Sequence, residues 1–433
     1  MKRRAKGQAV RPPGFAYRSS TSDSSSTLFC EKADLGRLAQ RYGTPLYVYS
    51  AEAILTRLKE FSQAFRAIPH TICYSIKANS TLGILKLIAK QDAGFDVVSG
   101  GELERVLRVR RKAAAKVVFS GVGKTVPEME LALRAGILVF NVESESELRA
   151  LAATAARLKK RASIALRVNP DVSAKTHPYI STGLHEHKFG VPIPEARRLY
   201  AAAAKLASLR VAGVSVHIGS QITDFSSFGD ALSRLAELVR ELRGAGHDIR
   251  YVDAGGGLGI SYEGAQESFA DQVAAYAKAV VTPLQKLGIH LLLEPGRSIV
   301  GPAGVLLARV IYRKKNDDKS FLIVDAAMND LIRPSLYGAH HEIVPVKQSV
   351  AQTEVVDVVG PICETGDFFA RDRKLPVTNE GDLLAILDAG AYGSVLGSNY
   401  NTRGRAAEVL VSRSGVSVIR KRESAADLLR NES

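Results

Sequence analysis

Short apolar runs and amphipathic stretches alternate along most of the chain. Eight of the runs are rich in β-branched and aromatic residues and end in small or polar residues, as buried parallel strands do; they lie at 71–76, 94–99, 115–120, 137–142, 163–168, 211–218, 249–254 and 289–295. Helical patterns such as TLGILKLIAKQ and PEMELALRAG fill the intervals. The early strand ends follow one another at the roughly 20 to 30 residues that a βα unit needs. Eight such units favour a closed (β/α)8 TIM barrel, although the pattern is also compatible with an open, doubly wound sheet.

The alternation stops past Gly301. Shorter strand-like runs follow at 305–315, 320–327, 353–361, 382–389 and 408–413, and the final SAADLLRNES predicts a short helix. This pattern indicates a C-terminal antiparallel β domain, joined by the segment that precedes the barrel. We therefore expect an α/β protein with four divisions: a disordered basic and Ser-rich tail at 1–27, a segment at 28–48 that packs with the β domain, a barrel at 49–304 and the β domain at 305–433.

The composition is that of a globular protein. Of the 433 residues, 46% are hydrophobic, and no apolar run approaches the roughly 18 residues that a membrane span needs. The basic start of the chain has no apolar core segment, so we expect neither a secretory signal nor a membrane partner. Cys30, Cys73 and Cys363 are too few and too scattered for a disulfide framework or a zinc site. Their usage favours a reducing cytoplasm and no bound metal.

The formal net charge of +15 raises the question of a nucleic-acid partner. Beyond the tail, however, Lys and Arg are spread over helical stretches such as RVLRVRRKAAAK, which is typical of a solvated helix face. A positive surface also suits an anionic small substrate or cofactor. We therefore expect a small-molecule ligand and no nucleic acid.

A lysine stands at the tip of the first barrel strand, in HTICYSIKAN. Catalytic residues of a βα barrel gather at the carboxyl ends of its strands. Those ends carry polar, ionisable or Gly residues here: Lys77, Asp96, Ser120, Asn141, Arg167 to Asn169, His217, Gly255 to Gly257 and Glu294 to Arg297. Taken singly, each also fits an ordinary structural role, such as a snorkelling Lys77 or a core His217.

Taken together, these residues suit a phosphorylated aldehyde. The Gly-rich motifs do not match nucleotide fingerprints, because Ile260 and Val118 occupy positions that need Gly. A lysine amine can bind an aldehyde covalently. The backbone N–H groups of a Gly turn, with Ser220, can bind a phosphate. Glu294 can keep a pyridine nitrogen protonated, and the flat ring of His217 can stack on an aromatic ring. Pyridoxal 5′-phosphate requires these four parts.

Seven segments carry a resemblance to one family: YSIKAN, HPYISTGLHEHKFG, HIGSQI, DAGGGLGISY, EPGR, CETGDFF and DAGAYGSVLGSNYN. In order and spacing, from about Leu28 to the C-terminus, they resemble the diaminopimelate decarboxylases, pyridoxal-phosphate enzymes of the alanine-racemase-like fold. The resemblance implies decarboxylation of meso-2,6-diaminopimelate to L-lysine and CO2, the last step of lysine biosynthesis. It also implies a homodimer with shared active sites, in which the Cys363–Glu364 segment reaches into the partner's barrel. The basic extension to about Thr27 lies outside the resemblance.

The resemblance also assigns roles to matching positions. Lys77 would bind the cofactor, His217 would stack on its ring, and Glu294 would face the ring nitrogen. The other cofactor contacts would come from Asp96, Ser220, Gly255, Gly256, Gly257, Gly296, Arg297 and Tyr392. The substrate would be bound by Arg297, Arg333 and Tyr337 at its far carboxylate, by Glu364 at its far ammonium and by Tyr392, with Cys363 as the proton donor.

Three alternatives stay open from the sequence. The nearest is a decarboxylase of the same fold that acts on ornithine, arginine or carboxynorspermidine; Arg333, Tyr337 and Glu364 speak against it. A non-catalytic pyridoxal-phosphate carrier would need neither the β domain nor Cys363. A nucleic-acid-associated protein would use the basic tail. Finally, the family resemblance suggests that the polar stretch His177–Gly190 forms a lid.

Overall fold

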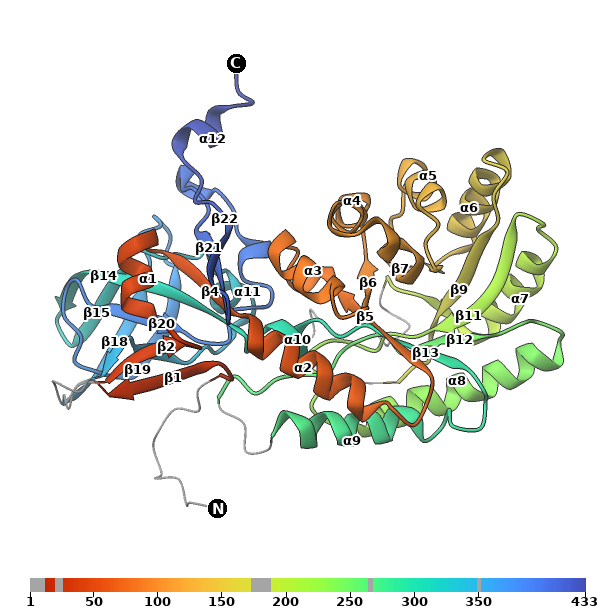
Figure 1. The fold of residues 1–433 in the computed structure, drawn as a ribbon, viewed down its shortest axis with the longest axis horizontal. Coiled ribbons are helices and arrows are strands. Elements are labelled where there is room, and N and C mark those ends of the chain that lie inside the picture. Colours follow the sequence, from red (N-terminus) through yellow and green to blue (C-terminus); the bar gives the residue numbers. More distant parts are fainter. Residues whose placement is uncertain (1–11, 20–25, 173–187, 264–267, 349–351) are drawn as a thin grey trace. The chain divides into compact units, whose positions relative to one another are not determined.

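The computed structural model describes residues 12–19, 26–172, 188–263, 268–348 and 352–433. The chain forms two compact units. The first comprises Arg57–Gly259 and Glu267–Ser298, and the second comprises Met1–Thr56, Ile260–Gln266 and Ile299–Ser433. Figure 1 labels the helices and strands of both units.

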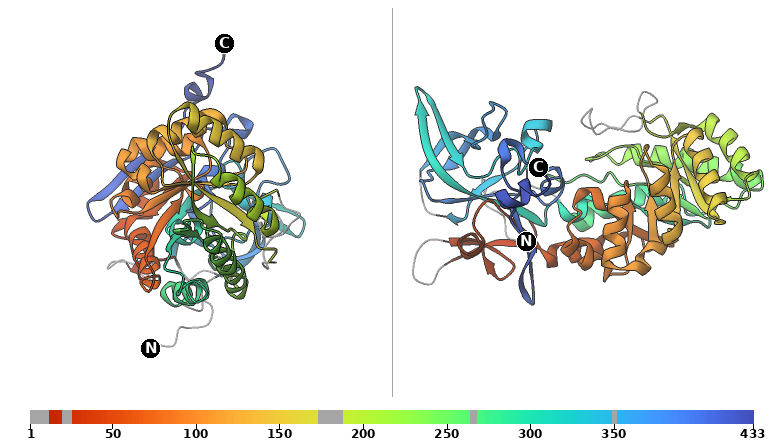
Figure 2. Two further views of the ribbon diagram at one scale, coloured as in Figure 1. Left: turned by 90° about the vertical axis from the view of Figure 1, so that its right-hand side faces the viewer. Right: turned by 90° about the horizontal axis from the view of Figure 1, so that it is seen from above.

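A closed parallel barrel forms the first unit. Its strands follow one another in the order β5-β6-β7-β8-β9-β11-β12-β13, and β13 pairs with β5 to close the ring. Figure 2 shows this ring end-on, inside a layer of helices. The bounds are β5 His70–Ser75, β6 Gly94–Val97, β7 Val117–Phe119, β8 Val139–Val142, β9 Ala162–Asn169, β11 Leu209–Ser215, β12 Tyr251–Asp253 and β13 His290–Leu293, with a short β10 (Val191–Pro192) beside β9. The predicted (β/α)8 barrel is confirmed.

Several barrel helices begin at polar caps that the sequence supplies. Their bounds are α2 Ala51–Ala64, α3 Leu82–Ala89, α4 Gly100–Val109, α5 Val126–Ala135, α6 Glu145–Arg157, α7 Ile193–Ala204, α8 Ser226–Gly244, α9 Phe269–Val281 and α10 Arg297–Val300. Ser99 and Ser144 each accept a backbone N–H of the first turn of α4 and α6, and Thr125 forms a capping box at α5. Gly136 ends α5 with a φ of +71°, in the left-handed region that favours glycine. Strand carboxyl ends and helix amino ends therefore meet at one rim.

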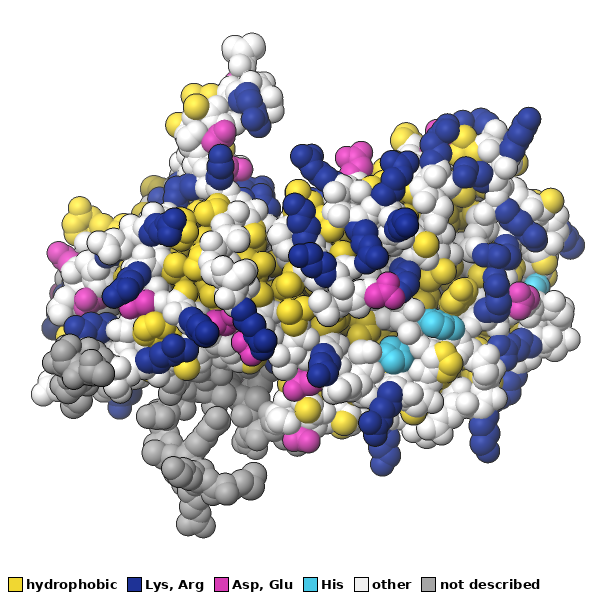
Figure 3. Space-filling view, viewed as in Figure 1, with side chains coloured by type: hydrophobic (Ala, Val, Ile, Leu, Met, Phe, Trp, Pro, Cys, Tyr) yellow, Lys and Arg dark blue, Asp and Glu magenta, His cyan; other side chains and the backbone are white. Residues whose placement is uncertain are grey.

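The surface of the described helices is strongly basic but not patterned as a single patch. Figure 3 shows Lys and Arg side chains spread over the face in view, among polar and apolar ones. On α4 and the following 3-10 turn η2 (Arg111–Lys116), Arg108, Arg111 and Lys112 are exposed while Leu103 and Val106 are buried. This is the distribution of an ordinary amphipathic helix. In the part of the chain that the structure describes, no helix is long and apolar enough to cross a membrane.

The second unit is built on a twisted, mostly antiparallel sheet in the order β19-β18-β15-β14-β4-β21-β22, with β20 joining β14 to β16. The bounds are β4 Leu46–Ser50, β14 Gly304–Asn316, β15 Lys319–Val324, β16 Ile343–Pro345, β18 Thr353–Val359, β19 Phe368–Pro376, β20 Leu383–Ile386, β21 Ala407–Ser412 and β22 Gly415–Arg420. The pairs β15–β18 and β4–β21 are parallel. The predicted antiparallel β domain is confirmed with those two exceptions. Short helices α1 (Leu35–Tyr42), α11 (Arg333–Tyr337) and α12 (Ala425–Leu429) complete the unit.

The N-terminal region differs from the expected tail at 1–27. Phe15–Ser19 forms strand β1, which pairs antiparallel with β2 (Ser26–Cys30); β2 also pairs with β3 (Ala33–Asp34) and β17 (Lys347–Gln348). Phe15 is buried in one core with Leu28 and Cys30. Phe15 and Tyr17 of β1 both pack on this core, and composition alone does not predict that contact. Residues 1–11 and 20–25 of the expected tail, and the expected lid up to His187, lie outside the described residues.

The units also divide the chain differently from the expected boundaries at 49 and 304. Strand β4 pairs with β14 and β21, so the chain up to Thr56 groups with the β unit. Ile299 to Gly304 leads directly into β14 and groups with it as well. Main-chain pairing, which the hydrophobic pattern does not specify, decides these boundaries.

Candidate active site

Lys77 follows β5 directly, in the 3-10 turn η1 (Ile76–Ala78). Its Nζ lies 3.2 Å from Oδ2 of Asp96 at the end of β6, and Ser75 Oγ donates to the same oxygen at 2.6 Å. The side chain of Lys77 is 36% exposed, whereas that of Asp96 is 0% exposed. A buried carboxylate thus holds the amine at the rim, where it remains reachable by a ligand.

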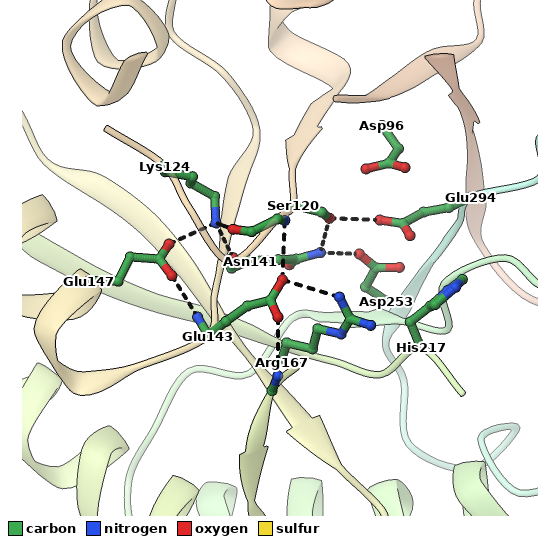
Figure 4. A network of polar contacts seen from close by, with 12 residues as sticks. Asp96, Ser120, Lys124, Asn141, Glu143, Glu147, Arg167, His217, Asp253 and Glu294 are labelled. Atoms are coloured by element: carbon green, nitrogen blue, oxygen red, sulfur yellow. Dashed lines mark hydrogen bonds and ion pairs between the residues drawn. The ribbon is translucent and has the colours of Figure 1, made fainter. Parts of the chain in front are cut away.

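A network of polar side chains connects the ends of four further strands (Figure 4). Ser120 follows β7, Asn141 lies in β8, Asp253 ends β12 and Glu294 follows β13. Asn141 Nδ2 donates to Asp253 Oδ2 at 2.6 Å and to Ser120 Oγ at 3.1 Å. Ser120 Oγ donates in turn to Glu294 Oε1 at 3.2 Å. The strand register of the barrel therefore brings together residues that are up to 174 positions apart in the chain.

The buried carboxyl groups near Glu294 favour a positive charge opposite them. Burial raises the pKa of Glu294 well above its ordinary value, the Asp253 and Asp96 carboxylates raise it further, and Lys77 opposes them. Oδ1 of Asp96 and Oδ1 of Asn141 are buried and accept no hydrogen bond from the residues that the structure describes. A protonated heterocyclic nitrogen opposite Glu294 would offset this excess of negative charge. The residues therefore fit pyridoxal 5′-phosphate.

His217 follows β11, at the same rim. Its Nδ1 accepts a hydrogen bond from the backbone N–H of Gly256 at 3.2 Å, so this nitrogen carries no proton. Desolvation lowers the pKa of His217 well below its ordinary value, and the charges of Arg167 and Lys77 lower it further. The imidazole is therefore neutral and fixed in orientation, as a stacking partner for an aromatic ring must be.

The glycine turn after β12 is shaped for close backbone approach. Gly255 and Gly257 have φ values of +66° and +107°. A Cβ on Gly256 would lie 2.3 Å from the carbonyl oxygen of Glu294, so only glycine fits there. Nearby, Arg297 Nη2 donates to Ser220 Oγ at 3.1 Å. Backbone N–H groups, a hydroxyl and a guanidinium are a donor set that binds phosphate.

Sequence reasoning missed a second, deeper set of charges at the rim. Glu143 Oε1 accepts from the Gly121 N–H and from Arg167 Nη1, both at 3.1 Å. Behind it, Lys124 Nζ lies 2.7 Å from Glu147 Oε1, and the lysine side chain is 0% exposed. The acidic run after β8 resembles an ordinary helix start, so the sequence alone does not mark Glu143 and Glu147 as site residues. Asp253 was also missed, although its position at a strand end was the available signal.

The predicted substrate-binding arginine lies in the second unit and is buried there. Arg333 begins α11 and is 5% exposed. Its Nη1 lies 2.7 Å from His341 Nε2, and its guanidinium stands 4.5 Å from the ring centre of Tyr262. Tyr337 ends the same short helix. A buried, stacked guanidinium is a rigid partner for a carboxylate rather than a solvated surface charge.

Cys363, Glu364 and Tyr392 also belong to the second unit. Cys363 and Glu364 are exposed, and the backbone N–H of Cys363 donates to Asn401 Oδ1 at 3.1 Å. A hydrogen bond to Glu364 raises the pKa of Tyr400. Tyr392 is half-buried, with a φ of +54°. The exposed thiol and carboxyl groups thus stand on an ordered loop.

A cavity of about 910 Å³ opens at the opposite end of the barrel, beside the first residues of β12 and β13. None of the predicted site residues lines it. Its charged groups are already engaged, since Arg243 donates to the carbonyl of Ile249 at 3.1 Å and Arg250 lies 3.2 Å from Asp248. The chemistry therefore belongs to the rim and not to this cavity.

Comparisons with known proteins identify the family of the chain. Residues 51–301 match the family model "Pyridoxal-dependent decarboxylase, pyridoxal binding domain". The chain is 52% identical to the diaminopimelate decarboxylase of Pseudomonas aeruginosa, over 97% of this chain and 98% of that protein. It is 48% identical to the Neisseria meningitidis enzyme over 94% of this chain and 97% of the relative.

Solved structures give the same result. The diaminopimelate decarboxylase of Helicobacter pylori, complexed with L-lysine, matches with a TM-score of 0.87 and 43% identity, covering 92% of this chain and 99% of that one. The enzyme from M. jannaschii, in co-complex with L-lysine, matches with a TM-score of 0.91 and 38% identity, covering 98% of each chain. The chain therefore belongs to the diaminopimelate decarboxylases, the pyridoxal-phosphate enzymes that convert meso-2,6-diaminopimelate to L-lysine and CO2.

Proposed function

We propose that Lys77 is the residue through which the protein binds its cofactor and that the rim around it carries out the decarboxylation. The observation that supports this most directly is the reachable amine of Lys77, held 3.2 Å from the buried Asp96 carboxylate. When bound, pyridoxal 5′-phosphate supplies an aldehyde that binds amines and a protonated ring that accepts the electrons left behind when CO2 departs.

The rim residues orient that ring and tune its charge. Glu294 would hold its buried carboxyl group toward the ring nitrogen and favour the protonated form of that nitrogen. His217, kept neutral by its hydrogen bond from Gly256, supports one face of the ring. The glycine turn at Gly255–Gly257, with Ser220, Gly296 and Arg297, would bind the phosphate, and the family resemblance assigns Tyr392 to the cofactor as well.

The far end of the substrate determines specificity. Arg333 and Tyr337, with Arg297, bind the far carboxylate, and Glu364 binds the far ammonium. Ornithine lacks that carboxylate and would leave the buried guanidinium of Arg333 without its ligand, which a site of this kind rejects strongly. This chemistry selects meso-2,6-diaminopimelate.

Cys363 donates the proton that replaces the departing carboxylate. Its thiol is exposed on a loop fixed by the hydrogen bond to Asn401, so it is available to a substrate bound elsewhere. The protein acts as a homodimer in which Cys363 and Glu364 of one subunit complete the active site of the other. We place it in the cytoplasm, where Cys30, Cys73 and Cys363 would keep their free thiols.

Three experiments test this proposal. Purified protein loaded with pyridoxal 5′-phosphate should be yellow, and borohydride reduction should fix the label to a single peptide that contains Lys77. Release of CO2 is then compared between meso-2,6-diaminopimelate and ornithine. A label on another lysine would refute the assignment of Lys77, and faster turnover of ornithine would refute the substrate assignment. Light scattering should give the mass of a dimer, and a mixture of Lys77→Ala and Cys363→Ala subunits should regain CO2 release, because one site of each mixed dimer has both Lys77 and Cys363 intact.

A further inference from the structure

Figure 4 shows the carboxyl groups of Asp253 and Glu294 next to each other at the rim, and the charge of Asp253 raises the pKa of Glu294. Asp253 is 1% exposed and Glu294 is 6% exposed, so water does not replace this contact. Two ionised carboxylates that lie side by side in a buried site repel each other, because little water screens their charges. A single proton shared by the two groups removes this repulsion, as in the known carboxyl dyads.

The neutral neighbours of the pair fix both carboxyl groups in place without supplying this proton. Asn141 donates to Asp253 Oδ2 at 2.6 Å, and the Gly255 N–H donates to Oδ1 at 2.9 Å. Ser120 donates to Glu294 Oε1 at 3.2 Å. Asp253 is therefore tethered on both oxygens, and it holds the carboxyl group of Glu294 from one side.

The charged and titratable neighbours oppose a second negative charge on the pair. Asp96 on β6 raises the pKa of both carboxyl groups, and Lys77, which lowers that of Glu294, is already in contact with Asp96. The Cys73 thiol and the Tyr276 hydroxyl face the pair from β5 and α9. Burial raises the pKa of each, and the carboxylates raise it further, so both groups stay neutral.

We propose that Asp253 is a positioning residue for the cofactor: it shares one proton with Glu294 in the cofactor-free protein, and the pair gives up that proton when the cofactor binds. The inference rests on the proposed function, since it takes Glu294 to face the ring nitrogen. The O–H bond of the pair breaks, and the proton passes to the ring nitrogen if that atom arrives unprotonated, or to water if it is already protonated. In both cases two carboxylates then face one cation, which removes the reason for sharing a proton.

The proton count of cofactor binding tests this proposal. Cofactor-free protein is titrated calorimetrically with pyridoxal 5′-phosphate in buffers of different ionisation enthalpy at one neutral pH. In Asp253→Asn the amide donates to Glu294, which is then already ionised, so this variant should release about one proton fewer than the wild type. Ser120→Ala is the matched control: it loses a hydrogen bond to the same Glu294 but no titratable group, and it should keep the wild-type count. Equal counts in wild type and Asp253→Asn would overturn the proposal.

An infrared measurement on the cofactor-free protein covers the case in which Asp253→Asn folds or binds poorly. At neutral pH the wild type should show the carbonyl band of a buried, protonated carboxyl group. The band should be lost in Asp253→Asn and in Glu294→Gln, and it should persist in Ser120→Ala. A wild type without this band refutes the shared proton whatever the cofactor does. A protein that shows the band but is not labelled at Lys77 refutes the proposed function instead.

Discussion

Replacing Lys124 by Met tests how strongly the charges behind the rim depend on one another. Lys124 Nζ donates to Glu147 Oε1 at 2.7 Å, to the Gly121 carbonyl at 2.8 Å and to the Asn141 carbonyl at 2.6 Å. The side chain of Glu147 is only 6% exposed. Removal of one partner from a buried ion pair leaves the other charge uncompensated and costs about 3–5 kcal/mol. We expect Lys124→Met to lower the free energy of unfolding by that amount at pH 8.

The loss of unfolding free energy in Lys124→Met should depend on pH in a defined direction. Burial raises the pKa of Glu147 above its ordinary value, and Lys124 lowers it. Without the lysine, the pKa of Glu147 in the folded state rises further. The folded variant then binds a proton more tightly than the unfolded chain, in which Glu titrates near about 4.3, so its stability falls as the pH rises above that value. The deficit relative to the wild type should therefore be smaller at pH 5 than at pH 8.

Denaturant unfolding at both pH values measures the deficit, and hydrogen exchange of peptides that cover α5 and α6 locates it. The matched control is Lys124→Met with Glu147→Gln, which removes both charges and should recover most of the lost stability. A single variant within about 1 kcal/mol of the wild type at pH 8 would show that the pair is not isolated from solvent. A double variant less stable than the single one would contradict the electrostatic explanation.

Three substitutions test the proposed roles at the active site. Lys77→Ala removes the amine, so the protein should lose its cofactor on gel filtration and show no CO2 release; retained colour would argue against Lys77. Cys363→Ala should lower kcat by roughly 10²–10⁴-fold, the usual range for general acid catalysis, while the cofactor absorbance stays unchanged. Full activity of that variant would exclude the proton-donor role. Arg333→Lys should raise KM for meso-2,6-diaminopimelate by about 10-fold or more, because a hydrogen bond to a charged group contributes about 1.5–3 kcal/mol. An unchanged KM with a normal melting temperature would remove Arg333 from the substrate site.

The sequence predicts the barrel and much of its rim because both follow from local patterns. A buried parallel strand is a continuous apolar run, and the residue that follows it must lie at the rim. This reasoning predicts that Lys77, Asp96 and Glu294 lie at one rim, and in the structure Lys77 Nζ lies 3.2 Å from Asp96 Oδ2. The Gly255–Gly257 turn followed from the same argument.

The site contacts that the sequence does not predict depend on how strands and helices pair across the barrel. Glu143 accepts from Gly121 and from Gly190, which is 47 positions away, and no local pattern marks such a contact. The burial of Lys124 against Glu147 is visible only when α5 and α6 are packed. Likewise, Phe15 orders β1 only through a core that it shares with distant residues.

The two sets of charges at the rim differ in how completely they are matched, and that difference marks the functional centre. Lys124 and Glu147, like Arg167 and Glu143, are closed pairs whose charges cancel within the protein. Around Glu294, by contrast, Asp96, Asp253 and Glu294 itself gather three carboxyl groups about a single lysine. A buried surplus of acid has no structural benefit, because well-packed neutral residues would be at least as stable. It is useful only if a cation enters from outside, and the ring nitrogen of pyridoxal 5′-phosphate is such a cation. Cofactor binding should therefore stabilise the rim by more than the phosphate contacts alone would, since it also removes an electrostatic conflict that the folded chain carries without it.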